Sequence, residues 1–187
     1  MELSLTWDLL VIVFFAVIVA YSFIVGKDES VKIIIASYIA IVAVQAIGNI
    51  LMMMNGQSQS LAQMLGLGLN MNIISTIKLI LFVGMIIFIA IKGGFEMEYA
   101  KDLDGVWNPI VTAAFGFATS GLLLIALLTY VSAKPILDET LKSAPLLQPL
   151  LTNSTLVNIM VDYQNIWFCL PAILLLIVGF LSSRNTN

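Results

Sequence analysis

Ser75 and Lys78 are the two residues whose types and spacing come closest to a catalytic pair. They stand three positions apart, which places both side chains on one face of a helix. A deprotonated lysine can activate a serine nucleophile. Ser37 and Ser120 are two further possible nucleophiles. The chain has no histidine, the commonest general base. A lysine near the end of an apolar segment also remains protonated, because it is in contact with water there, and a protonated lysine cannot act as a base. We therefore expect a structural role for the pair and no enzymatic activity.

Four carboxylates form a second group of residues that could do chemistry: Glu96, Glu98, Asp102 and Asp104. Oxygen ligands this close could hold a hard cation, but their spacing does not match the EF-hand loop. A solvated surface loop is the simpler interpretation. Cys169 is the single cysteine, so the chain can form no internal disulfide or cysteine metal cluster. We expect neither a metal nor a cofactor.

The composition points to a bilayer as the solvent. Hydrophobic residues make up 60% of the 187 residues, charged residues only 10%, and the mean hydropathy is +1.05. A spanning helix needs about 20 mostly apolar residues, and the apolar runs predict five such helices. They cover residues 7–25, 31–54, 73–91, 109–131 and 164–181. The predicted fold is an all-α, polytopic membrane helix bundle with short interfacial helices, in one domain over residues 1–187. No basic patch indicates a nucleic acid partner.

The connections between these runs differ in character. Gly26 fits a helix C-cap and opens a polar turn that ends at Ser30. Residues 61–72 read equally as a loop, an interfacial helix or an early start of the third span. The stretch 135–163 holds Pro135, Pro145 and Pro149 among several leucines. It predicts an interfacial segment with a second short helix around residues 154–161.

A few polar residues lie within the apolar runs. Tyr38, Gln45 and Asn49 form a narrow stripe on the second predicted helix, which must face protein or a wet cavity. Hydrogen bonding between helices and a solute path are the two interpretations. Asp8 and Lys78 lie near helix ends, where an interfacial anchor and a lysine reaching the headgroups are expected. Ion binding by Asp8, and pairing of Lys78 with Asp8 or a lipid phosphate, are the functional alternatives.

Small residues mark the fourth predicted helix as the central packing element. Thr112, Gly116 and Ser120 are spaced i, i+4 and i+8, so they share one face, and Gly121 lies beside it. Small residues let two helices approach closely in a membrane. Asn108 can cap this helix, and Pro109 suits its first position.

Basic residues predict the orientation. With the N-terminus outside, the cytoplasmic side receives Lys27, Lys32, Lys92, Lys101 and Arg184, while Lys134 and Lys142 fall outside. The positive-inside rule favours this arrangement, with the C-terminus cytoplasmic and residues 135–163 external.

Several short motifs resemble the CvpA (colicin V production protein) family over about residues 7–159. They are Trp7-Asp8-Leu9-Leu10 opening a helix, Gly26-Lys27 in the turn, Phe115-Gly116 with Gly121-Leu122-Leu123-Leu124, and Ser154-Thr155-Leu156 in the external segment. Ser120 stands where that family usually has an arginine, and a fifth span follows its usual four. The resemblance implies a bacterial inner-membrane protein with a non-catalytic role in the envelope or in export.

Two functions follow from these features. The first is a structural or accessory subunit of a membrane assembly, with itself or with other membrane proteins, because the chain combines small-residue packing faces with an apolar external segment. The alternative is a small channel or transporter that uses the Tyr38, Gln45 and Asn49 stripe as its path.

Overall fold

A computed structural model describes residues 7–57, 71–92, 107–132 and 134–184, and it confirms the all-α fold. The predicted carboxylate cluster at residues 96–104, Lys101 and most of the stretch 61–72 lie outside the described residues. The helices are α1 (Trp7–Gln57), α3 (Met71–Lys92), α4 (Trp107–Val131), the 3-10 helix η1 (Glu139–Ser143), α5 (Gln148–Asn153), α6 (Thr155–Asp162) and α7 (Gln164–Arg184).

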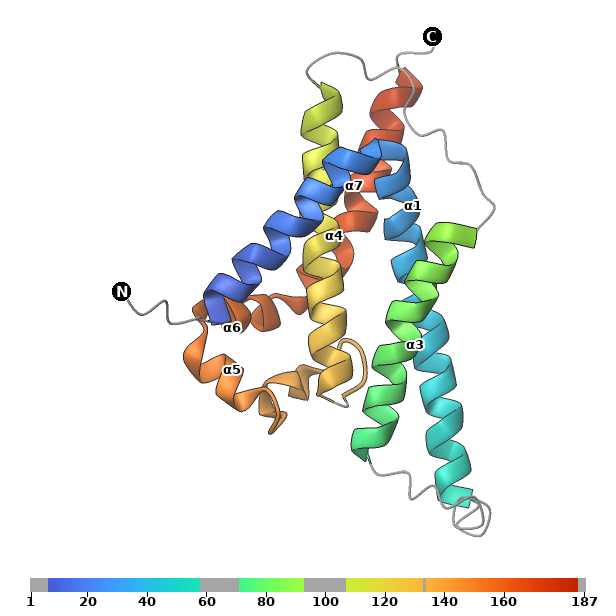
Figure 1. Ribbon diagram of the computed structural model, residues 1–187, viewed down its shortest axis with the longest axis vertical. Helices are drawn as coiled ribbons and strands as arrows, with labels where there is room; N and C mark the ends of the chain where they lie inside the picture. The colour runs from blue at the N-terminus through green and yellow to red at the C-terminus, as the bar shows by residue number, and fades with distance from the viewer. Residues whose placement is uncertain (1–6, 58–70, 93–106, 133, 185–187) are drawn as a thin grey trace.

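Gly26 divides α1 into two arms. Its φ of 85° and ψ of 177° interrupt the helix, and this backbone region is open almost only to glycine. The chain folds back there, so the N-terminal arm (residues 7–25) and the C-terminal arm (residues 27–57) run in opposing directions (Figure 1). The predicted polar turn over 26–30 is therefore too long: only Gly26 leaves the helix. Ser30 Oγ already donates to the Gly26 carbonyl at 2.8 Å, one helical turn back.

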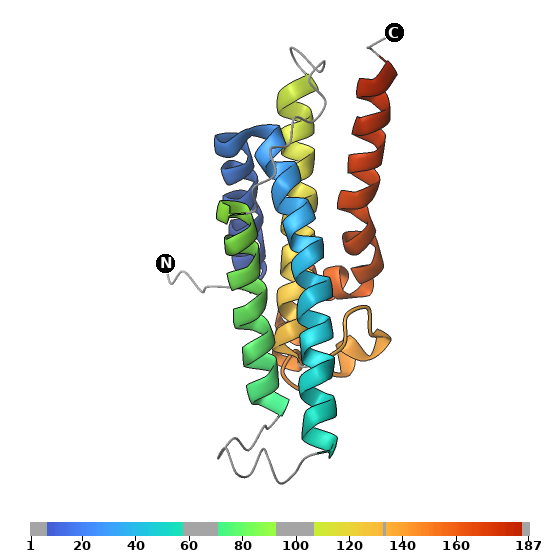
Figure 2. The same ribbon diagram turned by 90° about the vertical axis from the view of Figure 1, so that its right-hand side faces the viewer.

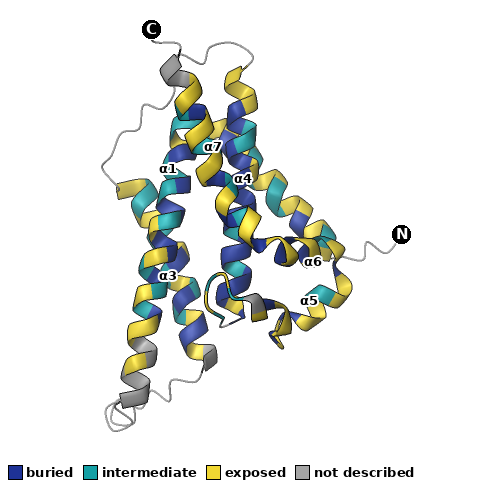
Figure 3. Ribbon diagram, turned by 180° about the vertical axis from the view of Figure 1, so that it is seen from behind, coloured by how far each residue is buried: buried dark blue, intermediate teal, exposed yellow. Residues whose placement is uncertain are grey.

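α4 is the centre of the bundle. It contacts α1, α3, α6 and α7, and most of its residues are buried. A helix that is apolar all round is covered by neighbouring helices or by lipid. α1, α3 and α7 keep many large apolar residues exposed, and Figure 3 shows exposed residues along these helices. α4 begins at Trp107, two residues before the predicted start.

Four helices are long and apolar enough to cross a membrane: α1 over Trp7–Ile50, α3 over Ile73–Lys92, α4, and α7 over Gln164–Leu181. The apolar stretch of α1 has 44 residues. At 1.5 Å per residue it is about 66 Å long, roughly twice the hydrocarbon thickness of a bilayer. The bend at Gly26 resolves this excess by turning the helix back on itself.

The segment 134–163 folds back onto one end of the bundle. α6 contacts α1, α4 and α7, and it crosses the end of the bundle where α1 begins (Figures 1 and 2). It occupies the place of the predicted short helix at 154–161. Leu141, Leu147 and Val157 of this segment share one buried cluster with Leu122 and Ile125 of α4. The segment is thus a packed cap of the bundle.

Candidate functional site

Lys78 lies inside the bundle, in the interface between α3 and the C-terminal arm of α1. Only 2% of the residue is exposed. A Cβ atom added to Gly48 would lie 2.0 Å from Lys78 Cε and 2.8 Å from Nζ, so the missing side chain of Gly48 provides the space for the lysine. The structure thus differs from the expected snorkelling of Lys78 to the headgroups. Its stem lies in the space over Gly48, within this interface.

This buried ammonium faces no acid among the residues that the structure describes, since none of their carboxylates forms an ion pair with it. Gln45 lies one helical turn before Gly48. Its Nε2 donates weakly to Asn49 Oδ1 at 3.4 Å, while its Oε1 is buried without a hydrogen-bond partner. A buried polar group without a partner is costly in an apolar interior. Among the described residues, the C-terminal arm of α1 thus carries one buried acceptor without a partner, Gln45 Oε1, one helical turn before the glycine that Lys78 contacts.

Ser75 does not pair with Lys78. Its hydroxyl donates to the carbonyl of Tyr130, with the carbonyl of Val131 at 3.4 Å, both at the end of α4. A serine nucleophile needs a hydrogen bond to its base, and this hydroxyl proton points elsewhere. Ser75 thus ties the first turns of α3 to the last turn of α4.

The three residues of the predicted polar stripe on the C-terminal arm have different surroundings. Tyr38 Oη donates to the Phe168 carbonyl of α7 at 2.5 Å, close to Pro171, whose missing N–H weakens that part of the helical ladder. This is the expected type of hydrogen bond between helices. Gln45 bonds within its own helix, and Asn49 is exposed. The three residues do not act together on one helix or cavity.

The small residues of α4 make close contacts within the chain. A Cβ on Gly116 would lie 2.8 Å from Ser22 Oγ and 3.0 Å from Val19 Cα, both in the N-terminal arm of α1. The hydroxyls of Thr112 and Ser120 donate to carbonyls of α4 itself, at 2.9 and 2.7 Å. These hydrogen bonds satisfy the hydroxyls, so the face can pack closely against α1.

Gly121 has a separate role. A Cβ there would lie 1.9 Å from the ring of Trp167, so the glycine seats this ring of α7 against α4. Trp167 forms an aromatic cluster with Phe15 and Phe117, with ring centroids 5.3 to 5.7 Å apart. Gly121 thus joins α4 to α7, while Gly116 joins it to α1.

Asp8 binds the start of α6. Its carboxylate accepts hydrogen bonds from Ser154 Oγ at 2.5 Å and from the Leu156 amide at 3.0 Å. Ser154 Oγ in turn accepts from the Val157 amide at 3.1 Å as the N-cap of α6. A carboxylate is stabilised at a helix N-terminus because unpaired amides point at it. The sequence offers one signal for this contact, Ser154 at the start of the predicted short helix.

Further polar contacts hold the rest of the cap. Asp138 caps η1 by accepting from the Thr140 amide at 2.8 Å, and its pKa is lowered by hydrogen bonds from the backbone and side chain of Thr140. Three more contacts complete the set: Lys134 Nζ with Thr140 Oγ1 at 3.0 Å, Gln164 Nε2 with the Asp138 carbonyl at 3.1 Å, and the ion pair of Lys142 with Asp162. The cap is therefore fixed at both of its ends.

Comparison with protein families, with curated proteins and with solved structures finds no match for the chain. The resemblance to the CvpA family therefore stays a prediction. Within the described part of the chain, no three acidic, cysteine or histidine side chains are grouped in a way that could hold a metal ion.

Proposed function

We propose that this chain is a five-span integral membrane protein that serves, without catalysis, as a structural or accessory subunit of a membrane assembly in the bacterial inner membrane. The observation that carries the proposal is the cap, residues 134–163. It is a folded surface at one end of the bundle, and it keeps large apolar side chains exposed. Exposing these apolar side chains to water would be unfavourable, so we expect another surface to cover them.

The two faces of the cap have different roles. Val157, Met160 and Val161 are buried against the bundle. Leu146, Ile159 and Tyr163 are exposed, each by about half of its surface. Because Asp8 and the contacts around Asp138 fix the segment, these side chains have a defined arrangement. A fixed apolar surface at the edge of the bilayer is a suitable docking face for another membrane protein.

The span count rests on the bend at Gly26. A single crossing cannot accommodate about 66 Å of apolar helix in a core of about 30 Å, whereas two crossings can. The bend carries Lys27 and Lys32, and α3 ends at Lys92, while Lys134 and Lys142 belong to the cap. The positive-inside rule then favours a cytoplasmic bend and an external cap.

Site-specific photo-crosslinking in intact membranes tests the docking face. A photoreactive residue at Ile159 should give a discrete protein adduct, whereas the same residue at Phe180, an exposed position on the outer face of α7, should give none. Adducts at neither position, or equal adducts at both, would refute a docking role for the cap.

A second candidate function, a small-ion path, is favoured by one observation: Lys78 is 2% exposed against Gly48 of the C-terminal arm of α1, and Gln45 Oε1 on the same arm is buried without a hydrogen-bond partner in the described structure. Polar groups within a membrane commonly mark ion pathways. Proteoliposomes loaded with a pH-sensitive dye test this. Proton flux that the Lys78→Met variant abolishes supports a path, and wild-type vesicles as tight as empty ones contradict it.

A further inference from the structure

The C-terminal arm of α1 carries a stripe of exposed residues along one side. Its members are three and four positions apart in turn, the heptad spacing of a helix that packs lengthwise against another helix. All five are exposed: Ile39, Val42, Ala46, Asn49 and Met53. The other side of the arm, with Ala40, Ile41 and Val44, is buried in the bundle, and in Figure 2 the arm lies in front of α4. This outer stripe is therefore a face that the described helices leave uncovered.

Asn49 is the polar member of the outer stripe, and it lies inside the apolar run. Residues 50–54 are all apolar, and Asn55 is the next polar residue. Five helical residues rise about 7.5 Å, so the Asn49 amide lies more than one helical turn inside the end of the span. An amide in hydrocarbon is costly unless it has hydrogen-bond partners. The exposed position of Asn49 thus calls for a polar group on whatever covers the stripe.

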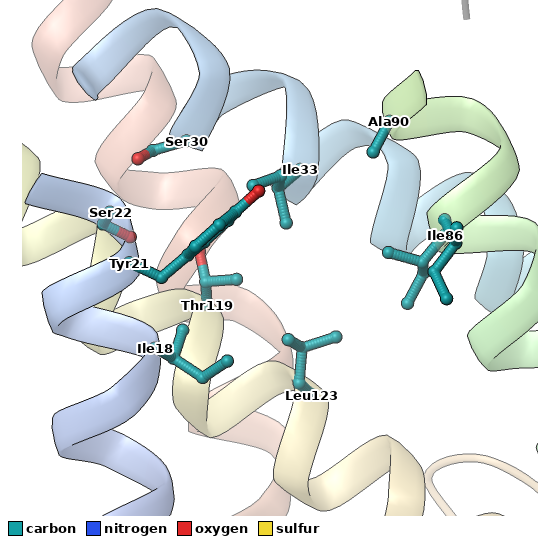
Figure 4. Close-up of a pocket in the computed structure, with 10 residues that line it drawn as sticks. Ile18, Tyr21, Ser22, Ser30, Ile33, Ile86, Ala90, Thr119 and Leu123 are labelled. Carbon is teal, nitrogen blue, oxygen red and sulfur yellow. The ribbon is translucent and has the colours of Figure 1, made fainter. Parts of the chain in front are cut away.

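The chain itself satisfies the Asn49 amide only in part. Its Oδ1 accepts a long hydrogen bond from Gln45 Nε2, at 3.4 Å. Among the hydrogen bonds of the described residues, none is donated by Asn49 Nδ2. Ser30 and Thr119 differ, because these residues on the walls of a cavity of about 200 Å³ near the bend (Figure 4) donate to carbonyls of their own helices at 2.8 and 2.7 Å. Asn49 therefore keeps donor capacity for a group outside the described chain.

A second copy of the chain supplies a group that matches this donor. Copies inserted in the same orientation are parallel, and a two-fold axis along the membrane normal brings identical residues together at the same depth. Asn49 of one copy then meets Asn49 of the other. An amide both donates and accepts, so two identical amides can bind each other. A single asparagine within an apolar heptad stripe also fixes the register of a parallel helix pair.

We propose that the outer stripe is a dimer interface, in which two copies pack their C-terminal arms in parallel and their Asn49 amides form hydrogen bonds across the two-fold axis. The same face continues to Lys32 at the bend, whose Nζ lies 3.5 Å from Glu29 Oε2. With Lys27 and Asp28, the four charges of the bend sum to zero, so net charge there does not oppose pairing. The inference rests on the helices spanning a bilayer, and it is independent of the cap as a docking face.

Cysteine cross-linking in native membranes locates the interface. In a Cys169→Ala background, single Val42→Cys and Ala46→Cys substitutions should each give a disulfide-linked dimer under mild oxidation, because a disulfide needs Cα atoms within about 7 Å. Ile80→Cys and Phe180→Cys are matched controls at exposed positions of α3 and α7, and they should remain monomeric. Equal cross-linking at all four positions, or no dimer from positions 42 and 46, would overturn the proposal. An adduct to a different protein in place of the dimer would also overturn it.

Energy transfer between labelled copies in liposomes tests the amide. The purified chain carries Cys169→Ala and Ser143→Cys, with a donor dye on half of the molecules and an acceptor dye on the rest, and dilution with lipid gives the dissociation constant. Asn49→Leu should raise this constant about tenfold, as expected for hydrogen bonds between helices in a membrane. Asn49→Gln keeps an amide and should stay closer to the wild type.

An unchanged dissociation constant in Asn49→Leu would contradict the proposal, because it would mean that the amide faces water or headgroups. No other protein is present in these liposomes, so their result does not depend on docking at the cap. A dimer that forms here while Ile159 gives no adduct in membranes would separate this interface from the proposed subunit role.

Discussion

Lys78 is unusual because it is a lysine buried in an apolar helix interface, and no acid forms an ion pair with it in the described structure. A lysine within a membrane span costs about 2.5–3.5 kcal/mol on insertion scales. Lys78→Met keeps most of the side-chain volume and removes the ammonium. We therefore expect the free energy of unfolding to rise by about 1–3 kcal/mol, measured by detergent-induced unfolding. A decrease would show that an acid balances Lys78 in the membrane.

Gly48 provides the control for this prediction. Gly48→Ala places a methyl group where Lys78 Cε lies, so the change should destabilise the wild type by about 1–3 kcal/mol. In a Lys78→Ala background the space is free, and the same change should be close to neutral. A double-mutant cycle measures this coupling, and additive effects of the two changes would argue against the contact.

Asp138 gives a prediction for pH at the residue scale. Hydrogen bonds from Thr140 lower the pKa of its carboxyl below the ordinary value of 3.8, and Lys134 acts in the same direction. Because the folded pKa is the lower one, the stabilisation by the carboxylate is fully present above about pH 4 and is lost as the pH falls through the folded pKa. Limited proteolysis of the cap by pepsin should therefore accelerate near pH 2–3. Asp138→Asn should be cleaved faster than wild type at pH 5 and lose this pH dependence.

At the scale of elements, Gly26 determines how α1 is divided. A residue with a Cβ is strained at φ 85° and ψ 177°, although nothing lies within 4 Å of the added atom. Gly26→Ala should therefore cost about 1–3 kcal/mol of stability through the backbone alone. Gly84→Ala is a matched control, because this glycine is within α3 and also has open space around it. It should be neutral or stabilising by up to about 1 kcal/mol. Thermal unfolding in detergent compares the two, and equal shifts would contradict the backbone argument.

The attachment of α6 is the second prediction for elements. Asp8→Ala removes the acceptor of both the Ser154 hydroxyl and the Leu156 amide. Leaving two polar groups without this partner should destabilise the cap. Hydrogen exchange should accelerate over residues 155–162 and remain unchanged in α3. Asp8→Asn keeps one acceptor oxygen and should show a smaller effect. Unchanged exchange in Asp8→Ala would mean that packing alone holds α6.

Hydropathy could predict the helices, because a long apolar segment in a bilayer must satisfy its own backbone hydrogen bonds, and an α-helix does so. It could not predict the direction of the Lys78 side chain, since the slot over Gly48 lies 30 positions earlier in the chain. The role of Asp8 depends in the same way on Ser154, a partner 146 positions away. Gly116 and Gly121 were identified as packing residues, but their separate neighbours, α1 and α7, follow only from the fold. Local pattern determines the elements, and contacts between distant segments determine the site.

At the scale of the whole molecule, the elements that lie at each end of the bundle decide the membrane topology. The bend at Gly26 and the C-terminal end of α7 lie toward one end of the bundle, while the start of α1 and the cap lie toward the other (Figures 1 and 2). Asp8 fixes Trp7 close to α6, so the N-terminal arm must run between the cap and the bend. If the cap is external, the first described residues are external as well, and the arm is a complete crossing.

Cysteine labelling distinguishes this five-span topology from its alternatives. In a Cys169→Ala background, single cysteines replace Trp7, Glu29 or Ser143, and a membrane-impermeant maleimide is applied to right-side-out and to inverted bacterial vesicles. Positions 7 and 143 should react only in right-side-out vesicles, and position 29 only in inverted ones. If the N-terminal arm lay along the membrane surface, positions 7 and 29 would react from the same side. If α1 crossed once as a straight helix, position 29 would lie within the hydrocarbon core and react from neither side. Reversed labelling of all three positions would keep five spans but place the cap in the cytoplasm, against the distribution of the lysines.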